Sequence, residues 1–129
     1  MKSLLRERIE QFVATLIAEE TYDDEEGVWL FADGSPCSVC MSSAQRIARE
    51  FDGEVVGYWS KANPAAEIGG ALCGGHDFAV IAGRWIVDYW AFHVARIVRT
   101  PVLDLDSPQD RQLASRLLGE RAAWEIVPV

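Results

Sequence analysis

Four side chains of this sequence have the types and the spacing that acyl-transfer chemistry needs. Cys37 and Cys40 stand three residues apart before an apolar helical pattern, His76 opens a strand-like segment, and Asp88 closes the next one. Acyl transfer uses a thiolate nucleophile, an imidazole base and a carboxylate that orients the base. A Cys-His-Asp site is therefore the first functional hypothesis.

The two cysteines lie where a helix is expected to begin. Ser35-Pro36 predicts a helix start and Asp52-Gly53 its end, because serine caps helices, proline fits the first turn, and glycine stops the helix. A thiol in the first turn meets unsatisfied amides and the positive end of the helix dipole, which favour the thiolate. The same amides could hold an oxyanion. The residues alone leave either Cys37 or Cys40 as the nucleophile.

The histidine and the aspartate fall on a predicted hairpin. A three-residue loop, Ile81-Ala82-Gly83, with Gly83 in the left-handed conformation, pairs residue 80 with 84 and residue 76 with 88. His76 and Asp88 would then lie opposite each other on one face, within hydrogen-bond reach. The carboxylate would fix the imidazole tautomer and stabilise its charged form.

These two segments resemble parts of known cysteine enzymes. The string GSPCSVC at residues 34–40 resembles the papain-type motif, in which a Cys-x-x-Cys ends in the nucleophile. The string GHDFAVIAGRWIVD at residues 75–88 resembles the His-strand, turn, strand-Asp unit of NlpC/P60-like peptidases. The papain-fold toxin domains of bacterial polymorphic toxins look most similar, with a Trp soon after the Asp, as Trp90 is here.

The resemblance, over about residues 35–90, implies a papain-like α+β fold and assigns a role to each candidate. Cys40 would be the nucleophile, His76 the general base and then acid, and Asp88 the orienting group, with Cys37 as the rival nucleophile. The implied enzyme is a peptidase, a deamidase or a transglutaminase-like protein that acts on an amide or thioester of a protein or peptide substrate. No cofactor is implied.

Two other hypotheses stay open. Cys37-x-x-Cys40 and Cys73-x-x-His76 together have the ligand spacing of a structural Cys3His zinc site. A catalytically silent papain-like module could instead bind a protein partner, with exposed tryptophans as anchors.

Composition limits the class of protein. The 129 residues, half of them hydrophobic, suit one domain spanning residues 1–129. The net charge of -8 disfavours nucleic acid as a partner, and the apolar runs are too short to span a membrane. Three cysteines do not make a closed disulfide framework, so we expect a reducing, cytoplasmic environment.

Periodicity and turn signals predict an α+β domain in which a helix packs on an antiparallel sheet. The predicted helices cover residues 3–20, 35–52 and 107–119, and the predicted strands cover residues 28–32, 54–60, 76–81, 84–88 and 124–127. Residues 23–26 read as a solvated acidic loop, residues 61–75 as a loop, and residues 90–98 as either strand or helix.

Overall fold

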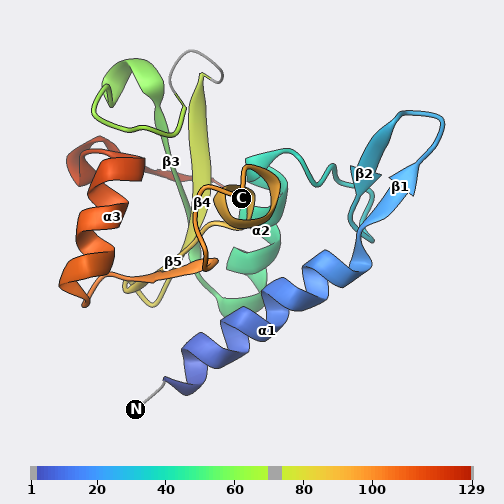
Figure 1. Ribbon diagram of the computed structural model, residues 1–129, viewed down its shortest axis with the longest axis horizontal. Helices are drawn as coiled ribbons and strands as arrows, with labels where there is room; N and C mark the ends of the chain where they lie inside the picture. Colours follow the sequence, from blue (N-terminus) through green and yellow to red (C-terminus); the bar gives the residue numbers. More distant parts are fainter. Residues whose placement is uncertain (1–2, 70–73, 129) are drawn as a thin grey trace.

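A computed structural model describes residues 3–69 and 74–128 of this chain and gives an α+β domain (Figure 1). The α-helices in this part are α1 (Leu4–Glu19), α2 (Cys40–Phe51) and α3 (Pro108–Leu118). The strands are β1 (Thr21–Asp23), β2 (Val28–Leu30), β3 (Glu54–Trp59), β4 (Gly75–Ile81), β5 (Trp85–Val87), β6 (Val102–Asp104) and β7 (Glu125–Val127). Short helical turns cover η1 (Ser60–Ala62), η2 (Trp90–Val94) and η3 (Arg121–Ala123).

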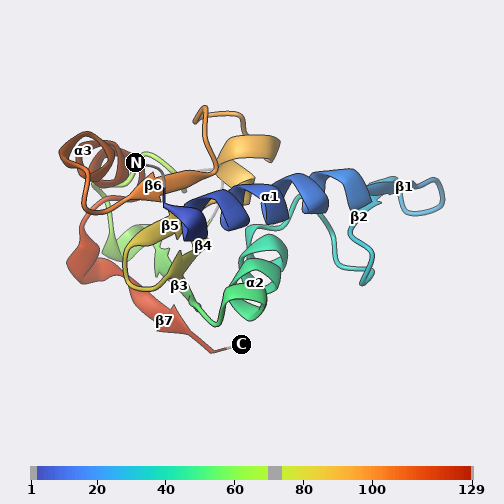
Figure 2. The ribbon, with the colours of Figure 1, turned by 90° about the horizontal axis from the view of Figure 1, so that it is seen from below.

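Five strands form one antiparallel sheet in the order β6-β5-β4-β3-β7, and helices cover both of its faces. Along β4, Ala79 and Ile81 belong to the core cluster that holds α1 and α2, whereas Phe78 and Val80 belong to the cluster that holds α3. This alternation follows from the two-residue repeat of a strand. Figure 2 shows α3 and the α1–α2 pair around the sheet, with the β1–β2 hairpin projecting beyond the end of α1.

The first and last helices form where the sequence predicts them. Ser3 caps α1 by accepting a hydrogen bond from the Arg6 amide, and Ser107 caps α3 in the same way from Asp110. In α1 the buried face consists of Ile9, Val13 and Leu16. Local capping chemistry and an apolar stripe were therefore sufficient to place both helices.

The helix that carries Cys40 begins later than predicted. The expected start at Ser35-Pro36 is wrong, because α2 begins at Cys40 after Val39. Pro36 instead forms a β-bridge with Leu30, and the Cys37 amide donates to the Trp29 carbonyl at 2.9 Å. These contacts hold the segment against β2 and keep it out of the helix. The predicted end is confirmed, since Asp52 takes the left-handed conformation at φ 51°.

The β4–β5 hairpin differs from the predicted register by two residues. Ile81 pairs with Trp85, and Val80 pairs with Ile86. Both Ala82 and Gly83 have positive φ, and the Arg84 amide closes the turn onto the Ile81 carbonyl at 3.1 Å. The loop therefore starts one residue later than expected. A shift of two residues leaves every side chain on its predicted face.

Of the three-residue strands, β2, β5 and β7 lie within the predicted strands 28–32, 84–88 and 124–127, whereas β1 and β6 were not predicted. The acidic run at residues 23–26 lies at the tip of the β1–β2 hairpin, and β6 follows a segment whose type the sequence left open. Residues 90–94 of that ambiguous segment form a π-helical turn. In β1 and β6 three residues were too few to show a two-residue repeat.

Candidate active site

Cys40 is the first residue of α2, and α2 packs against β4. Its thiol is half-buried and donates to Asp77 Oδ2 at 3.7 Å. The Ser42 amide already donates to the Val39 carbonyl, so the amides of Cys40 and Met41 remain as the helix-start donors without an acceptor in the described part of the chain. A half-exposed sulfur thus lies beside unsatisfied N–H groups at the positive end of a helix.

His76 and Asp88 form a buried pair. The Nε2 atom of His76 lies 2.6 Å from Asp88 Oδ2, and His76 is only 2 % exposed. The other carboxylate oxygen of Asp88 accepts from the Ala91 amide at 2.9 Å. Both oxygens of Asp88 are therefore occupied, which fixes the carboxylate and with it the imidazole ring.

The charge state of His76 depends on its two partners. Burial opposes the imidazolium, but the charge and hydrogen bond of Asp88, followed by those of Cys40, outweigh it and raise the pKa of His76 to about 10. Because Nε2 faces Asp88, Nδ1 is the ring nitrogen left for Cys40. The structure thus pairs His76 with Asp88 at hydrogen-bond distance and places Cys40 near enough to influence the pKa of His76.

The end of β5 explains how His76 reaches both partners. β5 stops at Val87, opposite Ala79, so the first residues of β4 have no β5 neighbour. The chain turns there into η2, and the Trp90 ring lies 5.1 Å from the His76 ring between centroids. Aromatic packing by Trp90 and Tyr58 keeps water from the imidazole and strengthens its interaction with Asp88.

Cys37 lies in a different environment from Cys40. It is 4 % exposed and belongs to the core cluster that includes Phe31 and Tyr89. Burial, followed by the negative charge of Glu20, raises the pKa of the Cys37 thiol to about 12. A thiol with this pKa stays protonated near neutral pH, so the structure disfavours Cys37 as the rival nucleophile.

The zinc hypothesis depends on a residue that lies outside the described ones, Cys73. Of its other members, Cys37 packs in the core, while Cys40 contacts Asp77. Within residues 3–69 and 74–128, no three His, Cys, Asp or Glu side chains converge in a way that could hold a metal ion. The four-ligand site stays a prediction.

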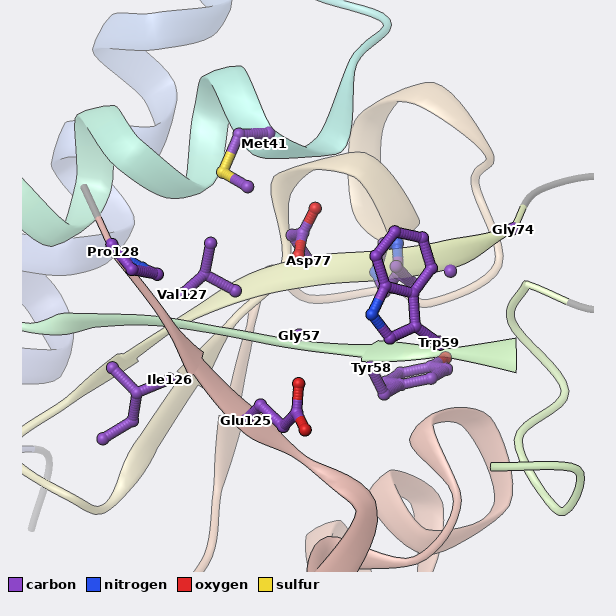
Figure 3. Close-up of a pocket in the computed structure, with 12 residues that line it drawn as sticks. Met41, Gly57, Tyr58, Trp59, Gly74, Asp77, Glu125, Ile126, Val127 and Pro128 are labelled. Carbon is purple, nitrogen blue, oxygen red and sulfur yellow. The ribbon is translucent and has the colours of Figure 1, made fainter. Parts of the chain in front are cut away.

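A cleft of about 420 Å³ is lined by His76, by Met41 and by Asp77, the acceptor of the Cys40 thiol. Figure 3 shows Met41 of α2, Asp77 of β4 and Trp59 of β3 around the same opening, with Glu125 of β7 along its border. Sequence reasoning did not assign Met41, Asp77 or Glu125 to the site, and it considered Trp59 only as one of the tryptophans that could anchor a protein partner. The nearest signal was the position of Asp77 directly after His76, which places it on the opposite face of the strand.

The class that fold and site define is an α+β domain with a thiol at a helix start, next to a buried His-Asp pair. Comparisons with models of protein families, with curated proteins and with solved structures found no match for this chain. In the described residues no helix is both long and apolar enough to cross a bilayer.

Proposed function

We propose that this domain is a papain-like cysteine enzyme that transfers an acyl group from an amide or thioester of a protein or peptide substrate. Cys40 is the nucleophile, His76 the general base and acid, and Asp88 the orienting carboxylate. The observation that carries the proposal is the buried 2.6 Å contact between His76 and Asp88, next to a thiol on the first residue of a helix. The resemblance of residues 34–40 and 75–88 to papain-type segments supports the same assignment.

In the first step the Cys40 sulfur attacks the carbonyl carbon of the substrate. The amides of Cys40 and Met41 face the developing oxyanion, and the C–N or C–S bond to the leaving group breaks to give a thioester. The His76 imidazolium gives its proton to the leaving amine or thiol. Asp88 keeps the ring oriented and stabilises its positive charge.

In the second step an acceptor attacks the thioester carbonyl while His76 removes the proton of that acceptor. Water as the acceptor completes hydrolysis of a peptide bond, or deamidation when ammonia was the leaving group. An amine as the acceptor completes transamidation. All three outcomes use the same residues, and the reducing cytosol expected from the cysteine content would keep the Cys40 thiol available.

A thioester-trapping experiment tests the proposal. The protein is incubated with short peptide thioesters and glutamine-containing peptides, and the intact mass is followed before and after treatment with hydroxylamine. We expect a hydroxylamine-sensitive acyl adduct on Cys40 that forms at least ~100-fold more slowly in His76→Ala and Asp88→Asn, since a lost general base typically costs this much. The matched controls are Cys37→Ala, which should acylate, and Cys40→Ala, which should not.

Zinc analysis of the same sample addresses the open alternative. Stoichiometric zinc with Cys37, Cys40 and Cys73 all protected from labelling would contradict the acyl-transfer proposal. An adduct that forms on Cys40 at the same rate in the Asp88→Asn protein would also contradict it, because the orienting carboxylate would then have no role.

A further inference from the structure

Two carboxylates flank a glycine on the face of the sheet that carries the cleft. Asp77 of β4 lies opposite Gly57 of β3, and Gly57 lies opposite Glu125 of β7. Residues directly opposite each other in antiparallel strands point to the same face, so Asp77 and Glu125 stand on either side of a position without a side chain. A Cβ at Gly57 would collide with Asp77 Oδ1, which places this carboxylate over the glycine.

Neither carboxylate has a Lys or Arg partner in the described part of the chain. Asp77 accepts from the Cys40 thiol, a weak donor, and Glu125 makes no ion pair there. The pKa of Asp77 is raised, chiefly by burial, although the charge of His76 and the Cys40 hydrogen bond act against the shift. The ionised form of a half-buried carboxylate without a Lys or Arg partner is destabilised by lost hydration, and a positively charged ligand would stabilise it.

The wall of the cleft next to Asp77 suits an organic cation. Trp59 lies on the same face of β3 as Gly57 and is 68 % exposed, and the described residues place no Arg side chain over its ring. An exposed indole attracts ammonium and guanidinium groups through its negative ring face. Met41 adds an apolar surface along which a carbon chain can pack.

We propose that Asp77, Glu125 and Trp59 form a subsite for a protonated amine or guanidinium carried by the substrate that reacts at Cys40. This inference rests on the proposed function for its choice of Cys40 as the reacting atom. The 3.7 Å contact between Cys40 and Asp77 places the cation within a few bonds of the reacting carbonyl. A carboxylate this close opposes negative charge on the sulfur, and a substrate cation bound to Asp77 removes that opposition.

Charged thiol reagents test the subsite without a known substrate. Aminoethyl, ethyl and sulfonatoethyl methanethiosulfonate differ in charge but undergo one reaction, in which the Cys40 thiolate attacks the sulfenyl sulfur, a mixed disulfide forms and methanesulfinate leaves. The rate at Cys40 is the difference between the wild-type protein and Cys40→Ala at fixed pH. We expect the ratio of aminoethyl to sulfonatoethyl rates to exceed that of the urea-denatured protein by about tenfold, which corresponds to the effect of a nearby charge in a partly solvated site.

The variants separate the subsite from the overall acidity of the chain. Asp77→Asn and Glu125→Gln should each lower the charge ratio by threefold or more. Glu54→Gln changes the net charge by the same amount at the far end of β3 and should leave the ratio unchanged. Equal charge ratios in the folded and denatured wild-type protein, or a ratio that Glu54→Gln lowers as much as Asp77→Asn does, would overturn the proposal.

The neutral ethyl reagent distinguishes failure of the subsite from failure of the proposed function. A fast neutral reaction that slows in Asp88→Asn, combined with no charge preference, would keep the acyl-transfer site and remove the subsite. If the ethyl reagent reacts at the rate of an ordinary thiol while the aminoethyl reagent is strongly preferred, the subsite is supported and the proposal that Cys40 is an activated nucleophile is contradicted. With a peptide thioester, faster acylation by an ammonium-bearing donor assigns the cation to the donor, and faster deacylation by an added amine assigns it to the acceptor.

Discussion

Cys37 and Cys40 lie three residues apart and have opposite surroundings. Cys37 lies in the core, where burial, followed by the charge of Glu20, raises its pKa. Cys40 lies at the start of α2, where its thiol contacts Asp77 in the wall of a cleft and His76 is protonated near neutral pH. Glu20 also accepts from the Tyr89 hydroxyl and lies 3.3 Å from His93 Nε2. One thiol therefore belongs to a structural polar cluster and the other to a site that can react.

The start of α2 creates this difference. Had the helix begun at Ser35-Pro36, Cys37 would occupy the first turn and Cys40 would lie one turn deeper. The bridge of Pro36 to Leu30 delays the helix, so that Cys40 meets the unsatisfied amides. The extended segment that contains Pro36 ends at Val39, and this end point decides which of the two cysteines lies at the helix start, where a thiolate is favoured.

The largest expected effect is a difference in labelling rate between the two thiols. At pH 7 we expect iodoacetamide to modify Cys40 at least ~100-fold faster than Cys37, because Cys37 is buried and protonated. No Lys or Arg lies between Arg8 and Arg46, so trypsin leaves both cysteines on one peptide and fragment ions must assign the label. Labelling of Cys37 at a comparable rate would remove the contrast.

The second effect is a pH dependence of stability that resides in the pair of His76 and Asp88. Because the pKa of His76 is raised to about 10 in the folded state, its contribution is complete below about pH 6.5 and is lost as pH rises towards 10. We expect the wild-type protein to lose on the order of 2 kcal/mol more unfolding free energy than Asp88→Asn over this range. Urea unfolding at both pH values measures the difference, and parallel losses in the two proteins would contradict the buried ion pair. Cys37 and Tyr89 also have raised pKa values, but both proteins contain them, so their contributions to the pH dependence cancel in the comparison.

Alanine substitutions give a third, smaller contrast between the thiols. Cys37→Ala removes a buried sulfur and should cost about 1–2 kcal/mol of unfolding free energy. Cys40→Ala truncates a half-exposed side chain and should change it by less than about 0.5 kcal/mol. Chemical unfolding at pH 7 compares the two, and a greater loss for Cys40→Ala would mean that Cys40 is a packing residue.

The smallest expected effect concerns the cluster around Glu20. Glu20→Gln weakens charge-assisted hydrogen bonds to Tyr89 and His93 and should destabilise the protein by about 1 kcal/mol. The iodoacetamide rate of Cys40 should stay within twofold of the wild type. A tenfold change in that rate would show that the two clusters are coupled and not independent.

Much of the His76–Asp88 geometry was predictable, because the two side chains share a face in any register that differs from the predicted one by an even number of residues. The hairpin turn lies one residue later than its sequence signal indicates, yet a two-residue shift keeps both side chains on one face. The helices α1 and α3 were predictable because their caps, Ser3 and Ser107, bond to amides within the first helical turn and need no distant contact.

Features that depend on contacts between distant segments were not predictable. The Ser35-Pro36 signal was outweighed by the β-bridge of Pro36 to Leu30 and by the hydrogen bond from the Cys37 amide to the Trp29 carbonyl, a pairing with β2 that the sequence pattern does not indicate. The role of Asp77 depends on Gly57 and Glu125, which only the β3 register brings beside it. The papain-like assignment itself remains a proposal that chemistry at Cys40 must test.

The most direct test of the central claim is the pH dependence of iodoacetamide labelling at Cys40 between pH 6 and pH 9. An ordinary thiol, with a pKa of about 8.5, slows by roughly tenfold for each pH unit below that value. If the pair of His76 and Asp88 activates Cys40, the wild-type rate should fall less steeply between pH 9 and pH 6 than the rate of Asp88→Asn, because the His76 imidazolium stabilises the thiolate. A steep fall in the wild-type protein, unchanged by Asp88→Asn, would contradict the account.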